Sequence, residues 1–119
     1  MSKFKSGFIM ALILFFASFG HSAPQDTYIT NLGKYSTSNA WTVFIRIDNG
    51  VESIQLANWG FGTTYVMKQS DVSPSTFALT YNLIKDAIIN SDKVVLMVTF
   101  ENTDPQNFRK LFKAGMLPK

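Results

Sequence analysis

Two neighbouring segments alternate between apolar and polar residues, and a turn signal separates them. The first, Trp41–Asp48 (WTVFIRID), has apolar residues at every second position, and the second, Val51–Asn58 (VESIQLAN), resumes the alternation. A period of two places alternate side chains on opposite faces of a strand. The DNG sequence at Asp48–Gly50 supplies residues that tolerate a positive φ angle, as tight hairpins require. The sequence therefore predicts a β-hairpin with one face in the core.

Further strands are predicted on both sides of this hairpin. Strand composition is found in YITNLGKY (Tyr28–Tyr35), where Gly33 could form a bulge, in TTYVMK (Thr63–Lys68) and in the apolar run KVVLMVTF (Lys93–Phe100). Because both faces of the last run are apolar, we expect a central strand that is covered on two sides.

One helix is predicted between the third and fourth strands. Ser73 is a suitable N-cap, and Pro74 fits the first helical turn, where its missing N–H costs nothing. The apolar residues that follow recur at helical spacing and predict a helix over about residues 74–90: Phe77, Tyr81, Ile84 and Ile88.

The C-terminal segment allows two interpretations. Asp104 and Pro105 resemble a helix cap and first turn, Phe108 and Leu111 follow at helical spacing, and Gly115 would end the helix. The alternative is a final strand through residues 108–112.

Taken together, these elements predict a mainly β protein with one or two helices. Four or five strands with a helix between the third and fourth are typical of a small five-stranded OB-fold-like barrel. The alternative architecture is an open antiparallel sheet covered by one helix.

The N-terminal residues have the organisation of a secretory signal peptide. Lys3 and Lys5 precede an apolar run at Phe8–Phe19, and small residues follow at Gly20–Ala23. The run of 12 residues is shorter than the roughly 20 that span a bilayer. We therefore expect a cleaved signal peptide at 1–23, a single small domain at 24–119, and export to the periplasm or the exterior, rather than a retained membrane anchor.

The composition of residues 24–119 excludes several kinds of chemistry. This part contains no Cys and no His, because His21 belongs to the expected signal peptide. Zinc sites with those ligands and Ser-His or Cys-His nucleophiles are therefore excluded. Nine basic and eight acidic residues remain, which is too balanced for a nucleic-acid-binding surface. The eight carboxylates mostly lie beside turn or cap signals, so we assign no catalytic residue, no metal and no cofactor, and we do not expect an enzyme.

The order of these features resembles a known family. A signal peptide, about 100 further residues, an early pair of strands, a Ser-Pro helix start and the KVVLMV strand are similar to B subunits of pentameric AB-type bacterial toxins, especially the subtilase-cytotoxin B type. The resemblance implies an OB-fold protomer, a homo-pentameric ring, a catalytic A subunit as partner, and binding of sialylated host glycans. It also implies that Asp26 and Thr30 of DTYIT contact the sugar. The family's disulfide has no counterpart here.

The stretch NWGFGTTY (Asn58–Tyr65) is the other candidate for ligand contact. Trp59 or Phe61 could stack on the apolar face of a sugar, while Gly60 and Gly62 would allow a bend. If the strand continues through the stretch, both aromatic side chains point to one side and pack into the barrel or against a neighbouring subunit.

Arg46 and Lys68 could meet an anionic sugar or could be solubilising surface charges. The leading functional prediction is a secreted binding module for a glycan or another cell-surface ligand. The alternative is a periplasmic or secreted structural or interaction protein, such as an inhibitor or assembly factor, without a small ligand.

Overall fold

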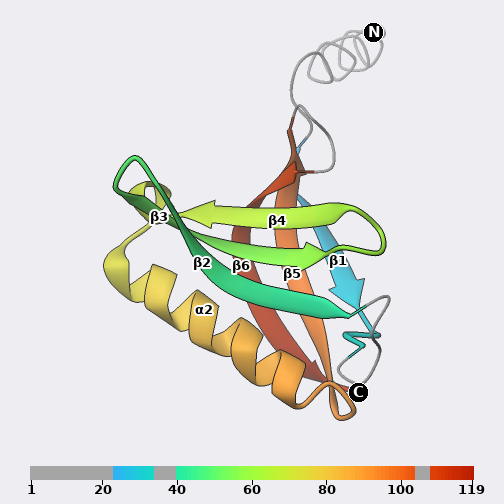
Figure 1. Ribbon diagram of the computed structural model, residues 1–119. Helices are drawn as coiled ribbons and strands as arrows, with labels where there is room; N and C mark the ends of the chain where they lie inside the picture. The colour runs from blue at the N-terminus through green and yellow to red at the C-terminus, as the bar shows by residue number, and fades with distance from the viewer. Residues whose placement is uncertain (1–22, 34–39, 104–107) are drawn as a thin grey trace, which may run out of the picture.

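Six strands form one open sheet, and one helix covers one face of it (Figure 1). The computed structural model describes residues 23–33, 40–103 and 108–119. Within these ranges the strand order is β1-β5-β6-β4-β3-β2. The elements are β1 (Gln25–Ile29), β2 (Trp41–Asp48), β3 (Val51–Asn58), β4 (Thr63–Lys68), a short 3-10 helix η1 (Gln69–Asp71), α2 (Pro74–Ile89), β5 (Val94–Asn102) and β6 (Phe108–Pro118).

The predicted hairpin is confirmed, with its register. Asp48 lies opposite Val51, and Trp41 lies opposite Asn58 at the far end of the pair. The turn residues Asn49 and Gly50 both have positive φ angles, 52° and 80°. Such a two-residue turn matches the twist of the flanking strands, which explains why the alternation continues without a slip.

β6 lies between β4 and β5 and is the strand that joins the two halves of the sheet. It runs antiparallel to β5 and parallel to β4, whereas the other neighbouring strands are antiparallel. The parallel pairing is short and covers only Thr64–Val66 against Phe108–Lys110. β4 and β6 are therefore paired by backbone hydrogen bonds only along this short stretch.

The core lies between α2 and the face of the sheet that it covers. Ile84 and Ala87 of α2 are fully buried, as are Leu56 of β3 and Leu96 and Val98 of β5. The helix begins and ends almost as predicted. Its N-cap Ser73 accepts a hydrogen bond from the backbone N–H of Thr76 at 3.1 Å, and Pro74 occupies the first turn.

Replacing Ser73, the N-cap of α2, tests how much the cap stabilises the start of the helix. Ser73→Ala should lower the free energy of unfolding by about 1 kcal/mol, because one N–H of the first turn loses its acceptor. Ser75→Ala is the matched control, since the Ser75 hydroxyl forms a hydrogen bond with the Ser73 hydroxyl, at 3.2 Å, and with no backbone N–H of the described residues. Urea denaturation measures both; equal losses in the two variants would show that the cap contributes nothing of its own.

The closed barrel is not confirmed, whereas the alternative of an open sheet covered by one helix fits the structure. β1 and β2 are the two edges of the sheet, and no ladder of hydrogen bonds joins them in the described ranges. In the same ranges one backbone bond connects the two edges: the N–H of Trp41, the first residue of β2, donates to the carbonyl of Leu32, which follows β1, at 3.0 Å.

Of the two interpretations of the C-terminal segment, the strand is confirmed: the segment is β6, because residues 109–118 pair along β5. Asp104 and Pro105 lie outside the described residues. The first strand covers Gln25–Ile29 instead of residues 28–35, and Gly33 takes a left-handed φ of 67° after it has ended. Gly33 is therefore part of a turn and not a bulge.

The expected signal peptide at 1–23 lies outside the described residues except for its last residue, Ala23. Within the described ranges, no helix combines the length and the apolar character needed to span a bilayer.

Candidate functional site

A pocket of about 360 Å³ opens beside the end of β1, and we call it the Arg109 pocket. It brings together residues from β1, the start of β2, the β3–β4 turn, β4 and β6, which are far apart in the sequence. The lining residues are Thr27, Tyr28, Ile29, Thr30, Asn31, Trp41, Phe61, Thr63, Tyr65 and Arg109.

Buried aromatic rings make the floor of this pocket. Trp41 is only 8% exposed and stacks on Tyr65, with the ring centroids 5.8 Å apart. Tyr65 also meets the edge of Phe100 at 5.3 Å. Close-packed rings of this kind have little freedom to move, so the floor is rigid.

Arg109 is held on two of these rings. Its guanidinium carbon lies 5.5 Å from the centre of the Tyr65 ring and 5.0 Å from that of Phe100, and its Nη1 donates to the Tyr65 hydroxyl at 3.0 Å. Both ring distances are within the range of cation–π attraction. The Tyr65 bond uses one of the five guanidinium N–H groups, so the side chain is oriented while most of its donors remain.

No carboxylate of the described residues neutralises Arg109. The one ion pair in those ranges joins Arg46 to Asp48. In addition, the Nε atom of Arg109 is buried and has no hydrogen-bond partner in the part of the chain that the structure describes. A fixed and unpaired guanidinium is suited to binding a carboxylate or another anion.

The rim of the pocket combines hydroxyl groups with exposed rings. Thr27, Thr30 and Thr63 supply hydroxyls, which can exchange hydrogen bonds with a polyol. Tyr28 and Phe61 are 57% and 68% exposed, although aromatic rings of this size are usually covered. The pocket thus offers a cation, hydroxyls and flat apolar surface within one hollow.

The four predicted ligand-binding residues are not brought together. Thr30 and Phe61 line the Arg109 pocket, whereas Asp26 and Trp59 do not. Asp26 accepts a hydrogen bond from the Thr99 hydroxyl at 2.7 Å, on the neighbouring strand.

The aromatic stretch forms a turn instead of a continuous strand. Residues 59–62 connect β3 to β4, and Gly62, with a φ of 69°, donates its N–H to the Asn58 carbonyl at 2.9 Å. Trp59 therefore does not pack into the sheet: it is 69% exposed and stacks on Phe44, with the ring centroids 6.3 Å apart. Phe61 is also exposed, so neither ring packs into the sheet of its own chain, and packing against a neighbouring subunit stays a prediction.

Sequence reasoning missed Arg109, Tyr65 and Trp41 as parts of one site. The interpretation of residues 108–112 as a strand contained the needed signal. A period of two puts Arg109 on the same face as the buried Leu111, which the helical interpretation concealed. Arg46 and Lys68, the two cations considered for an anionic ligand, are exposed and lie outside the Arg109 pocket.

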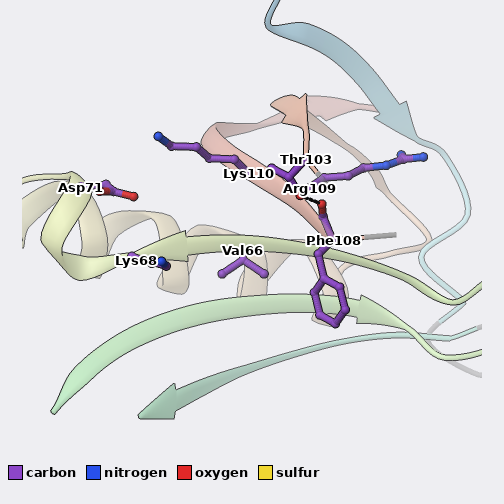
Figure 2. A pocket seen from close by; sticks show the side chains of 7 residues that line it. All are labelled: Val66, Lys68, Asp71, Thr103, Phe108, Arg109 and Lys110. Atoms are coloured by element: carbon purple, nitrogen blue, oxygen red, sulfur yellow. Dashed lines mark hydrogen bonds between the residues drawn. The ribbon is translucent and has the colours of Figure 1, made fainter. Parts of the chain in front are cut away.

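A second hollow, of about 500 Å³, lies where β4 and β6 diverge (Figure 2). Lys110, Lys68 and Asp71 gather on one side of it, while Arg109 extends in the opposite direction. The Thr103 hydroxyl donates to the Phe108 carbonyl at its wall. The basic residues that line this hollow outnumber its one carboxylate, so charge alone does not distinguish it from the Arg109 pocket. The Arg109 pocket differs because its guanidinium is held on two aromatic rings.

Neither metal ligands among the described residues nor similarity to known proteins adds to the description of the site. No three carboxylates come close enough to hold a metal ion in the part of the chain that the structure describes. Comparisons of the chain with protein-family models, with curated protein sequences and with solved structures found no match.

Proposed function

We propose that this chain is an exported binding module that holds an acidic glycan in the Arg109 pocket. The observation that carries the proposal is the guanidinium of Arg109, fixed over Tyr65 and Phe100 and unpaired with any described carboxylate, beside a rim of hydroxyls and exposed rings. No bond is made or broken in this proposal, and it requires no cofactor.

Each group of the pocket has a distinct role in the proposal. Arg109 binds the acidic group of the sugar, since a guanidinium forms paired hydrogen bonds with a carboxylate. The hydroxyl of Thr30 binds the ring hydroxyls, and the exposed face of Phe61 covers the apolar face of the sugar. The resemblance to toxin B subunits, which implies sialylated glycans, agrees with this ligand chemistry. Of the two residues that the resemblance suggested, only Thr30 belongs to the proposed site.

We also propose that the fold derives from an OB-type barrel that has remained open. In its favour, the strands from β2 onward follow the order β2-β3-β4-β6-β5 with one parallel pair, and the single long helix lies between β4 and β5. An OB-fold is itself a partly open five-stranded barrel. The bond from Trp41 to Leu32 would mark the place where the two edges approach each other.

A glycan array followed by calorimetry with sialyllactose tests the binding proposal. Phe61→Ala and Thr30→Val should each lower the affinity about threefold to tenfold, because one removes about 1 kcal/mol of ring contact and the other a single hydrogen bond. Trp59→Ala and Asp26→Asn are the matched controls, because they alter an equally exposed ring and a polar β1 residue outside the pocket. If the wild type binds no glycan, or if the controls lose as much affinity as the pocket variants, the proposal is wrong.

A further inference from the structure

The edge strand β2 has backbone groups that point away from the sheet. In an antiparallel pair, alternate residues direct their N–H and C=O groups towards the partner strand. The two-residue turn makes Asp48 and Val51 the hydrogen-bonded pair beside it, so the even-numbered residues of β2 bond to β3. The odd-numbered residues then point outward. The Trp41 N–H agrees with this assignment, because it donates to Leu32 and not to β3.

Three consecutive outward positions remain open on this edge: Val43, Ile45 and Ile47. Their outward backbone groups form no hydrogen bond with any residue that the structure describes. Trp41, the fourth outward residue, is already engaged by Leu32. The open stretch of the edge is therefore centred on Ile45.

The edge has few of the features that normally prevent strand pairing. Natural edge strands are protected by charged side chains, above all lysine, and by proline, bulges or short length. β2 has eight residues, contains neither proline nor lysine, and pairs with β3 without a bulge. Its two charged side chains, Arg46 and Asp48, form an ion pair with each other at 3.0 Å, so their charges offset one another. Ile47 is 64% exposed at this edge, which leaves apolar surface uncovered next to the open backbone groups.

We propose that β2 pairs antiparallel with β2 of a second copy of this chain, about a two-fold axis at Ile45. Such an interface is self-complementary and closes after two subunits. Ile45 then lies opposite its own copy, Val43 lies opposite Ile47, and Phe44 lies opposite Arg46. The helix-covered faces of the two sheets become continuous, because residues of like parity face each other.

Side-chain chemistry selects this register over its neighbours. Ile47 becomes covered by Val43, and Arg46 comes within reach of the Phe44 ring, whose partner Trp59 lies 6.3 Å from it. A shift of the axis by one position towards the turn would place Arg46 against its own copy, and like charges directly opposite are destabilising. The shift the other way would require the outward groups of Trp41, of which the N–H is occupied. A register that placed odd-numbered residues opposite even-numbered ones would put the helix-covered face of one sheet beside the uncovered face of the other.

Cysteine cross-linking of the exported protein tests both the pairing and its register. The chain contains no Cys, so a disulfide in a single-cysteine variant must join two copies. Directly opposite residues have Cα atoms about 5.5 Å apart, within disulfide range. Ile45→Cys should therefore give a covalent dimer on mild oxidation. Val43→Cys is the matched control on the same strand and face, because the two copies of this position are more than about 14 Å apart in the proposed register.

Light scattering after size-exclusion chromatography tests the proposed β2–β2 interface without cross-linking. The wild type should show a concentration-dependent dimer that Ile47→Lys shifts to the monomer, because a lysine on the edge must be desolvated by pairing. The monomer should tolerate this change, since Glu52 lies opposite the new ammonium. Leu79→Lys alters an equally exposed apolar residue on α2 and should leave the dimer intact.

Several results would overturn this interface. They are a monomer at every concentration, a ring of five, a dimer that survives Ile47→Lys, or cross-linking as efficient at Val43 as at Ile45. Loss of the dimer in Ile47→Lys should leave sialyllactose affinity unchanged, because Ile47 does not line the Arg109 pocket. The interface and the proposed glycan site can therefore fail independently.

Discussion

Arg109→Met is expected to reduce the affinity for sialyllactose by about tenfold to a hundredfold. A hydrogen bond to a charged group contributes about 1.5–3 kcal/mol, and each 1.4 kcal/mol changes the dissociation constant tenfold. The side chain is already oriented by Tyr65 and by the Phe100 ring, so little ordering opposes the binding of the anion. Lactose, which lacks the acidic sugar, should bind equally to the wild type and the variant.

The same substitution should leave stability unchanged or raise it slightly. The Nε atom of Arg109 is buried without a hydrogen-bond partner among the described residues, and burial of an unpaired polar atom is costly. Methionine removes this atom and keeps an apolar contact with the two rings, although the cation–π attraction to them is lost. The Tyr65 hydroxyl loses the Arg109 donor in the variant, which limits any gain.

Calorimetry and urea denaturation on one preparation separate these two effects. Lys110→Met is the matched control: it removes the adjacent positive charge, which points away from Arg109 (Figure 2) and lies outside the pocket. A large loss of stability in Arg109→Met would instead make Arg109 a structural residue. If Arg109→Met and Lys110→Met lose the same affinity, Arg109 attracts the ligand only through its charge and does not bind it directly.

Ile84→Ala is expected to lower the free energy of unfolding by about 2–5 kcal/mol. Ile84 is fully buried between α2 and the sheet, and the truncation leaves a cavity that the packed core fills only in part. This loss is a large fraction of the 5–15 kcal/mol typical of a whole domain. Because the chain has no disulfide to restrain the unfolded state, the core must supply most of the stability.

Leu79→Ala on the same helix is the control for this prediction. Leu79 is 69% exposed, so its truncation should change the free energy of unfolding by less than about 0.5 kcal/mol, apart from a small gain in helix propensity. Urea denaturation of both variants gives the comparison. Similar losses at the two positions would mean that the face of α2 with Ile84 is not the one that packs on the sheet.

The local elements were predictable because their signals lie within a few residues. The alternation of β2 and β3 and the positive-φ residues Asn49 and Gly50 determine the hairpin register before any distant contact forms. Ser73 and Pro74 likewise predict where α2 begins. These are short-range effects, and the structure agrees with them.

The C-terminal segment shows the limit of such reasoning. Phe108 and Leu111 satisfy helical spacing, yet the segment is a strand because its partners, β4 and β5, leave a place that only another strand can fill. Strand formation depends on neighbours more than on intrinsic preference. The open choice between helix and strand also concealed the site, because Arg109 can join Tyr65 and Phe100 only when residues 108–118 are a strand.

The sequence by itself determined the hairpin, the start of α2 and the absence of His and Cys chemistry in residues 24–119, since each depends on residue types at close spacing. The tertiary structure alone decided that Thr30 and Phe61 share a pocket with Arg109, while Asp26 and Trp59 lie outside it. Arg109 is 79 residues from Thr30 and 48 from Phe61 along the chain. The position of β6 in the sheet brings them together, and that position follows from pairing with strands distant in sequence, which no local pattern encodes.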